Sequence, residues 1–107
     1  MQVKIKATRV DLDQEIKDYV QEKMDMLEKY LGQIPVINCA VELERIAGDQ
    51  NSGKVYRAEV NLSLPREMLR CEKTTDDLNK AIDKVKDHLA EMVKKYKEKM
   101  VDKKRGK

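Results

Sequence analysis

The sequence predicts an α+β fold with the order β-α-β-β-β-α, in which a four-stranded sheet carries two helices packed on one face. Three observations lead to this fold. Several segments alternate apolar and polar residues, two longer segments repeat apolar residues every three or four positions, and a polar loop separates two of the alternating segments. At 107 residues the chain has room for one domain. We expect residues 1–101 to form it and residues 102–107 to be a flexible basic tail.

The first third of the chain predicts one strand and one helix. Residues 2–8 alternate with the period of a half-buried strand, and lysines occupy the outward positions. Asp11 or Asp13 can cap the helix that follows, because an aspartate oxygen accepts a hydrogen bond from a first-turn amide, and Gly32 ends the helix. The apolar stripe between these signals consists of Leu12, Ile16, Tyr19, Val20, Leu27, Tyr30 and Leu31.

The middle of the chain predicts three antiparallel strands. The first begins at Pro35, a polar hairpin loop at 48–53 leads to the second, and Pro65 ends that strand. Leu69 and Cys71 mark a short last strand. The inward residues of the two longer strands are Ile37, Cys39, Val41, Leu43, Tyr56, Ala58, Val60, Leu62 and Leu64. Both cysteines lie in apolar stretches without Cys-x-x-Cys spacing, so we expect buried, reduced thiols.

The last third of the chain predicts a long amphipathic helix. Thr74 or Thr75 can cap it, and two aspartates follow in its first turn. After Met100 the residues are polar, and we expect the helix to fray there. Its apolar stripe consists of Leu78, Ile82, Val85, Leu89, Met92, Val93, Tyr96 and Met100.

The composition argues against several classes of function. The four glycines are isolated and form no phosphate-binding loop, His88 has no catalytic partner in the sequence, and the carboxylates are scattered. We therefore expect no enzyme, no cofactor, no metal and no small-molecule substrate. The N-terminus has no apolar signal region, and no run approaches the roughly 18 apolar residues of a membrane span. These features favour a cytoplasmic protein that has no membrane partner.

The charges are unevenly distributed along the chain. The net charge is only +3, but residues 94–107 carry eight basic and two acidic residues, whereas residues 11–32 carry seven acids and three lysines. Along the last helix, a row of lysines about 20 Å long lies opposite the apolar stripe and could follow the phosphates of a nucleic acid. Ion pairs such as Glu91–Lys95 would instead make this a solvated face, and charge alone favours that alternative. The basic tail also has two possible roles: it either increases solubility or contacts RNA.

Lys23 occupies an unusual position in the first helix. On a helical wheel it falls about 20° from Leu12 and Tyr30, inside the apolar sector. A lysine there either extends its stem past the helix edge to water or emerges between the helices toward a ligand.

Three segments together resemble one protein family. Residues 77–85, Asp-Leu-Asn-Lys-Ala-Ile-Asp-Lys-Val, are similar to the Asp-Met-Tyr-Ala-Ala-Ile-Asp-Lys-Leu block of the ribosome hibernation-promoting factor family, also called ribosome-associated inhibitor A or sigma-54 modulation protein. The similarity continues through Lys94-Lys95-Tyr96-Lys97 and includes Leu69-Arg70-Cys71-Glu72. The first helix follows the family's spacing at Ile16, Tyr19, Val20, Lys23, Leu27, Glu28, Tyr30 and Leu31. The resemblance covers roughly residues 1 to 100, implies the same fold and matches the short family form.

The resemblance implies a factor of stress or stationary phase that binds the small ribosomal subunit and its 16S rRNA. Members of this family lie between head and body over the messenger and tRNA channel, where they block initiation while preserving the ribosome. It also implies a monomer off the ribosome whose basic residues contact phosphates. Carried over by position, the candidate RNA-binding residues are Lys23, Lys29, Lys80, Lys84, Lys94, Lys95 and Lys97.

The sequence departs from the family pattern at several positions of the basic face. His88 and Glu91 stand where basic residues are common, and Met26 stands where a lysine is common. Asn79 replaces a tyrosine, and Lys80 replaces a small residue. A smaller number of neutralised phosphates predicts weaker binding and a shallower salt dependence, by about 0.7–0.9 logarithmic units for each phosphate. Two other functions remain alternatives: a protein-interaction module on the same fold and a general binder of double-stranded RNA.

Overall fold

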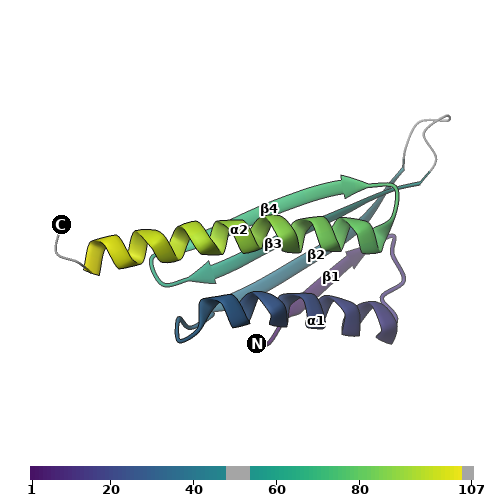
Figure 1. Cartoon of the computed structure of the whole chain (residues 1–107). Helices are drawn as coiled ribbons and strands as arrows, with labels where there is room; N and C mark the ends of the chain where they lie inside the picture. The colour runs from purple at the N-terminus through teal and green to yellow at the C-terminus, as the bar shows by residue number, and fades with distance from the viewer. Residues whose placement is uncertain (48–53, 105–107) are drawn as a thin grey trace.

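A computed structural model describes residues 1–47 and 54–104 of the protein. The sheet has the strand order β1-β2-β3-β4, with β1 parallel to β2 and the other two pairs antiparallel. Figure 1 shows both helices side by side on one face of this sheet. The α+β class and the predicted order are confirmed. The elements are β1 (Lys4–Thr8), α1 (Gln14–Leu31), β2 (Asn38–Ala47), β3 (Lys54–Leu64), β4 (Glu67–Thr75) and α2 (Leu78–Lys104).

Helix α1 begins and ends at two of the predicted signals. The Ile16 amide donates a hydrogen bond of 2.9 Å to the Asp13 side chain, and Gly32 has the positive φ of 62° that favours glycine. The prediction that Tyr30 belongs to the buried stripe is wrong, because its side chain is 52% exposed. The buried residues of the helix are Val20, Met24, Leu27 and Leu31. Tyr30 lies about 90° from the centre of that stripe, at the helix edge.

The central strands pair over a longer range than the pattern predicts. β4 pairs with β3 from Glu67 to Thr75, so the fourth strand is not short. Ile37 was expected to face the core, but it precedes the first residue of β2 and is 66% exposed. The alternation thus extends beyond the part of the sheet that the helices cover. The predicted hairpin loop at 48–53 lies outside the described residues, although the strands on either side of it pair as expected.

Helix α2 is capped by a residue that the sequence pattern placed inside its first turn. The Lys80 amide donates a hydrogen bond of 3.0 Å to the Asp77 carboxylate, so Asp77 is the cap rather than Thr74 or Thr75. The Thr75 hydroxyl instead accepts a hydrogen bond of 3.1 Å from the Asp77 amide. The helix also continues past Met100 to Lys104. Residues 105–107 lie outside the described range, and the boundary between domain and tail stays a prediction.

Both cysteines are buried free thiols, as predicted. Burial raises the pKa of the Cys39 thiol to about 11 and also raises the pKa of Cys71. Cys39 belongs to a core that Val41, Leu43 and the buried residues of both helices complete. Over the described residues, neither helix combines the length and the apolar character that a bilayer crossing requires.

Candidate nucleic-acid interface

The amphipathic sequence of α2 decides which of its side chains reach solvent. Its buried stripe packs on β3 and β4, and the Tyr96 hydroxyl donates a hydrogen bond of 2.8 Å to the Pro65 carbonyl, which fixes the second half of the helix to the β3–β4 turn. Because this stripe occupies one side of the helix, the lysines are directed outward. The buried residues are Ala81, Ile82, Val85, Leu89, Val93 and Tyr96.

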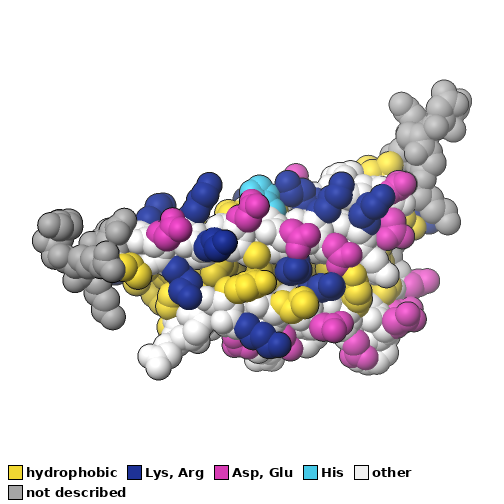
Figure 2. Space-filling model, viewed as in Figure 1, with side chains coloured by type: hydrophobic (Ala, Val, Ile, Leu, Met, Phe, Trp, Pro, Cys, Tyr) yellow, Lys and Arg dark blue, Asp and Glu magenta, His cyan; other side chains and the backbone are white. Residues whose placement is uncertain are grey.

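The predicted lysine row divides into two groups around α2. Lys80, Lys84 and Lys95, which we call the outer lysines, point away from α1. Lys94 and Lys97, the groove lysines, face α1, and the centre of this pair lies about 100° around the helix from the centre of the outer lysines. Figure 2 shows cationic side chains along α2 interspersed with acidic ones. The two groups therefore present ammonium groups to two directions rather than to one.

Three of these lysines are not neutralised by neighbouring carboxylates. Across the part of the chain that the structure describes, Lys84, Lys94 and Lys95 are exposed and form no ion pair. The Glu91–Lys95 pair, which the solvated-face alternative invokes, is therefore not formed. Lys80 lies 3.7 Å from Asp76, an exposed pair of the kind that contributes little to stability. An exposed ammonium without a protein partner is available to a phosphate.

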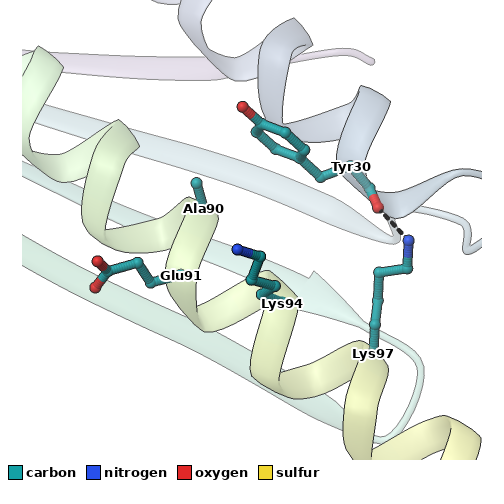
Figure 3. A pocket seen from close by; sticks show the side chains of 5 residues that line it. All are labelled: Tyr30, Ala90, Glu91, Lys94 and Lys97. Carbon is teal, nitrogen blue, oxygen red and sulfur yellow. Dashed lines mark hydrogen bonds between the residues drawn. The ribbon is translucent and has the colours of Figure 1, made fainter.

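A groove of about 300 Å³ separates α1 from the second half of α2. Its walls are formed by Tyr30, Ala90, Glu91, Lys94 and Lys97 (Figure 3). The Lys97 ammonium donates a hydrogen bond of 2.7 Å to the backbone carbonyl of Tyr30 and so crosses from α2 to α1. The groove joins an exposed aromatic ring with cationic side chains.

Lys23 is bound to α2 by a small polar cluster. Its ammonium lies 3.4 Å from the Asp83 carboxylate and 5.1 Å from the centre of the Tyr19 ring, and its side chain is 20% exposed. The Tyr19 hydroxyl donates a hydrogen bond of 2.5 Å to the same carboxylate oxygen. This hydrogen bond, assisted by burial, raises the pKa of Tyr19 to about 12. Lys23 thus emerges between the helices, where its contact is a carboxylate of the protein.

Lys29 is not brought together with the lysines of α2. It lines a shallow hollow on α1 with Asp18, Glu22 and Asp25. Figure 2 shows further acidic side chains gathered over the N-terminal part of α1. A phosphate near Lys29 would face these carboxylates as well, so this lysine is placed less favourably than the outer lysines.

The face of the sheet opposite the helices carries a network of glutamates and arginines. The strand register places Glu42, Glu59 and Glu72 directly beside one another across three strands. Like charges in this position repel, and the Arg57 guanidinium offsets the repulsion. It contacts the carboxylates of Glu42, Glu44, Glu59 and Glu72 at 3.4, 3.1, 3.0 and 2.9 Å. With Arg70 and the exposed Lys4 and Lys6 on the same face, the carboxylates are balanced by cations. A face of mixed charge attracts a polyanion less than the unpaired lysines of α2 do.

Comparison with known proteins identifies the family. The sequence model of the family described as Sigma 54 modulation protein / S30EA ribosomal protein matches residues 3–101. The chain belongs to this family. The matched range includes the four strands, α1 and nearly all of α2, so it contains every residue of the groove and every outer lysine. The resemblance stated from the sequence is confirmed.

Individual members of the Sigma 54 modulation protein family show how far the similarity extends. The chain is 28% identical over 93 residues to the ribosome hibernation promotion factor of Deinococcus radiodurans, covering 87% of this chain and 47% of that protein. It is 32% identical over 82 residues to the protein of the same name from Staphylococcus aureus, covering 77% and 40%. The chain thus spans less than half the length of these relatives. The crystal structure of the Thermus thermophilus Protein Y N-terminal domain superposes with a TM-score of 0.76 at 30% identity, covering 90% of this chain and 99% of that domain.

The exposed lysines of α2 are evident from the sequence, but the roles of three residues near them are not. Asp83 forms an ion pair with the Lys23 ammonium, and Tyr30 forms a wall of the groove. Lys86 lies between the helices, with only 15% of its side chain exposed. Lys86 forms an ion pair of 2.7 Å with Asp87. On a helical wheel, Asp83, Lys86 and Ala90 share the side of α2 that carries the groove lysines, and this spacing could have indicated them.

Proposed function

We propose that this protein binds the small ribosomal subunit through phosphates of 16S rRNA and silences translation by covering the messenger and tRNA channel. The observation that supports this function best is the set of exposed, unpaired lysines on α2, in a chain that belongs to the Sigma 54 modulation protein / S30EA ribosomal protein family. The relatives from Deinococcus radiodurans and Staphylococcus aureus are named ribosome hibernation promotion factors. We extend that role, a cytoplasmic location and a monomeric state off the ribosome to this chain as parts of the proposal.

The outer lysines and the groove lysines have the main role in this proposal. Lys84 and Lys95 lie eleven residues apart on the same side of α2, or about 16 Å along the helix, so they reach different phosphates. Each phosphate that an ammonium neutralises releases condensed counterions, which makes binding strongly dependent on salt. Lys80 adds a third contact once it leaves Asp76, at a small cost because that pair is exposed.

Lys23 and Lys29 contribute less in this proposal than the lysines of α2. Lys23 would have to leave Asp83 or share its ammonium between that carboxylate and a phosphate. Lys29 lies among the acids of α1. The acids of α1 repel phosphates, and the open sheet face has paired, balanced charges. Both features favour the orientation in which α2 faces the RNA.

Co-sedimentation with purified small subunits over a salt series tests the proposal. The wild-type protein is expected to bind at low salt, and Lys84→Glu combined with Lys95→Glu to abolish binding while circular dichroism and the unfolding midpoint stay unchanged. In a milder variant, Lys84→Gln with Lys95→Gln, two fewer neutralised phosphates make the slope of log K against log salt shallower by about 1.4–1.8. Lys4→Glu combined with Lys17→Glu is the matched control, because both lysines are exposed and lie outside α2. It imposes the same change of charge and is expected to bind nearly as the wild type does.

Three outcomes would point elsewhere. A wild-type protein that stays at the top of the gradient at low salt excludes ribosome binding and favours the protein-interaction module. Equal affinity for small subunits and for any RNA duplex favours a general double-stranded RNA binder. If binding falls equally in the α2 variant and the control, the protein binds through its overall charge and not through this helix face.

A further inference from the structure

Tyr30 differs from Tyr19 and Tyr96 in the contacts of its hydroxyl group. The hydroxyl groups of Tyr19 and Tyr96 donate hydrogen bonds to Asp83 and to the Pro65 carbonyl. Within the described residues the Tyr30 hydroxyl has no such partner, and half of the side chain is exposed in the groove between the helices. A single exposed aromatic residue is common on protein surfaces, so it is the groove around Tyr30 that points to a partner.

The surroundings of Tyr30 have two different chemical characters. Ala90 lies across the groove from the ring and gives it an apolar surface, with the Lys94 ammonium on the same side of the groove (Figure 3). The Lys97 ammonium carries positive charge at the other end, by the Tyr30 backbone carbonyl. Figure 2 shows apolar side chains in the space between the helices with cationic side chains close by. A nucleotide has the same two characters, because its base is a flat apolar ring and its phosphate is an anion.

We propose that Tyr30 stacks on one unpaired base of the bound RNA, while Lys94 and Lys97 hold the phosphates on either side of that nucleotide. The inference rests on the proposed function and names the RNA element that the groove takes. The base must be unpaired, because bases inside a duplex are stacked on their neighbours and do not offer a face to a side chain. Aromatic side chains beside lysines or arginines are the usual platform for such bases.

The remaining groove residues fit this arrangement. Glu91 lines the groove near Ala90, but its carboxylate points away from Tyr30 and does not fill the space beside the ring (Figure 3). The hydrogen bond between Lys97 and the Tyr30 backbone carbonyl fixes the ammonium at the backbone end of Tyr30 without occupying all of its donors. At about 300 Å³, the groove is at the small end of ligand clefts, which suits one base and excludes a helix of RNA.

Two substitutions at Tyr30 separate stacking from other effects. Tyr30→Leu removes the ring but leaves the Lys97 hydrogen bond, whose acceptor is a backbone carbonyl, and leucine is a good helix former. We expect it to weaken binding to small subunits about 5- to 150-fold, the factor that one base–aromatic stack contributes, with no change in the slope against salt. Tyr30→Phe keeps the ring and is expected to bind as the wild type does.

A fluorescent reporter tests the stack directly. The chain has no tryptophan, so Tyr30→Trp introduces a single indole that can stack in the same way. We expect small subunits to quench its fluorescence. Met68→Trp is the control, because Met68 is 59% exposed. It lies on the open face of the sheet, since its neighbours in β4, Glu67 and Leu69, are directed to the helix side. Its fluorescence is expected to stay unchanged by the subunit.

The outcomes distinguish this inference from the proposed function. If the wild type binds small subunits but Tyr30→Leu binds equally well and the Tyr30→Trp signal is not quenched, base stacking is refuted and ribosome binding stands. Equal weakening in Tyr30→Leu and Tyr30→Phe would assign the effect to the hydroxyl and also refute stacking. If the wild type does not bind small subunits at all, both proposals fail.

Discussion

Replacement of Arg57 should lower the stability of the fold by breaking one network of ion pairs. Its guanidinium contacts four glutamates on the open face of the sheet, and its side chain is only 18% exposed. Arg57→Met keeps the apolar stem that covers the sheet and removes the charge. The substitution leaves Glu42, Glu59 and Glu72 side by side, with the exposed Arg70 as the remaining guanidinium at 2.8 Å from Glu59.

The expected cost is about 3 kcal/mol. Breaking a buried ion pair costs about 3–5 kcal/mol. Glu59 is the buried partner at 5% exposure, but it keeps Arg70, so we assign it about 2 kcal/mol, below the full cost of a buried pair. The other three glutamates are partly exposed and contribute about 0.3–0.5 kcal/mol each. In a domain of this size the sum corresponds to a fall in Tm of about 12–24 °C.

Urea unfolding followed by circular dichroism measures this cost. Raising the salt from about 0.05 M to about 1 M shortens the Debye length to about 3 Å and should reduce the difference between variant and wild type, because it screens the repulsion among the glutamates. Arg45→Met is the matched control, since Arg45 is exposed on β2 and forms no ion pair in the described residues. We expect it to cost less than about 0.5 kcal/mol. If Arg57→Met costs no more than Arg45→Met, or if its cost is independent of salt, the network does not stabilise the sheet as argued.

The remaining predictions concern the two helices. Hydrogen bonding to Asp83 raises the pKa of Tyr19 from 10.0 to about 12, so its stabilising effect is complete below pH 10 and is lost as the pH rises through about 12. Tyr19→Phe should therefore cost about 1–2 kcal/mol at neutral pH, and the difference from wild type should disappear at high pH in unfolding curves measured across this range. Cys39 titrates in the same window in both proteins, so the difference between the curves isolates Tyr19. At the start of α2, Asp77→Ala should cost about 1 kcal/mol in urea unfolding and Thr74→Ala much less, and the reverse order would restore Thr74 as the cap.

The sequence was sufficient to predict the elements because each one buries a regular pattern. Val20 and Leu27 at helical spacing, or Cys39 and Val41 at strand spacing, report a face that must be covered. The incorrect predictions of burial occur where an apolar pattern continues past the region that another element packs against. Tyr30 keeps the spacing of the α1 stripe and Ile37 keeps the alternation of β2, yet both lie at the edge of the packed region. How far one element covers another depends on their relative position, which local periodicity does not contain.

The candidate site could be predicted only in part for a related reason. The lysines of α2 are exposed because the opposite side of that helix is buried, and this follows from the sequence of α2 alone. The partner of Lys23 is Asp83, sixty residues away, and the partner of Lys97 is a carbonyl of α1. The row of glutamates around Arg57 requires the register of three strands. Contacts of this kind are fixed by the packing of separate elements.

The pairing of charges explains how a chain with a net charge of only +3 can present a cationic surface. Many of the acids are occupied within the fold: Asp83 by Tyr19 and Lys23, and the glutamates of the open face by Arg57. Lys84, Lys94 and Lys95 form no such pair among the described residues. The core separates the open sheet face from α2, and exposed charges more than about 8 Å apart are largely screened at physiological salt. A polyanion that approaches α2 therefore responds to the unpaired lysines nearby more than to the net charge, which is why the arrangement of the pairs matters more to the proposed function than the total.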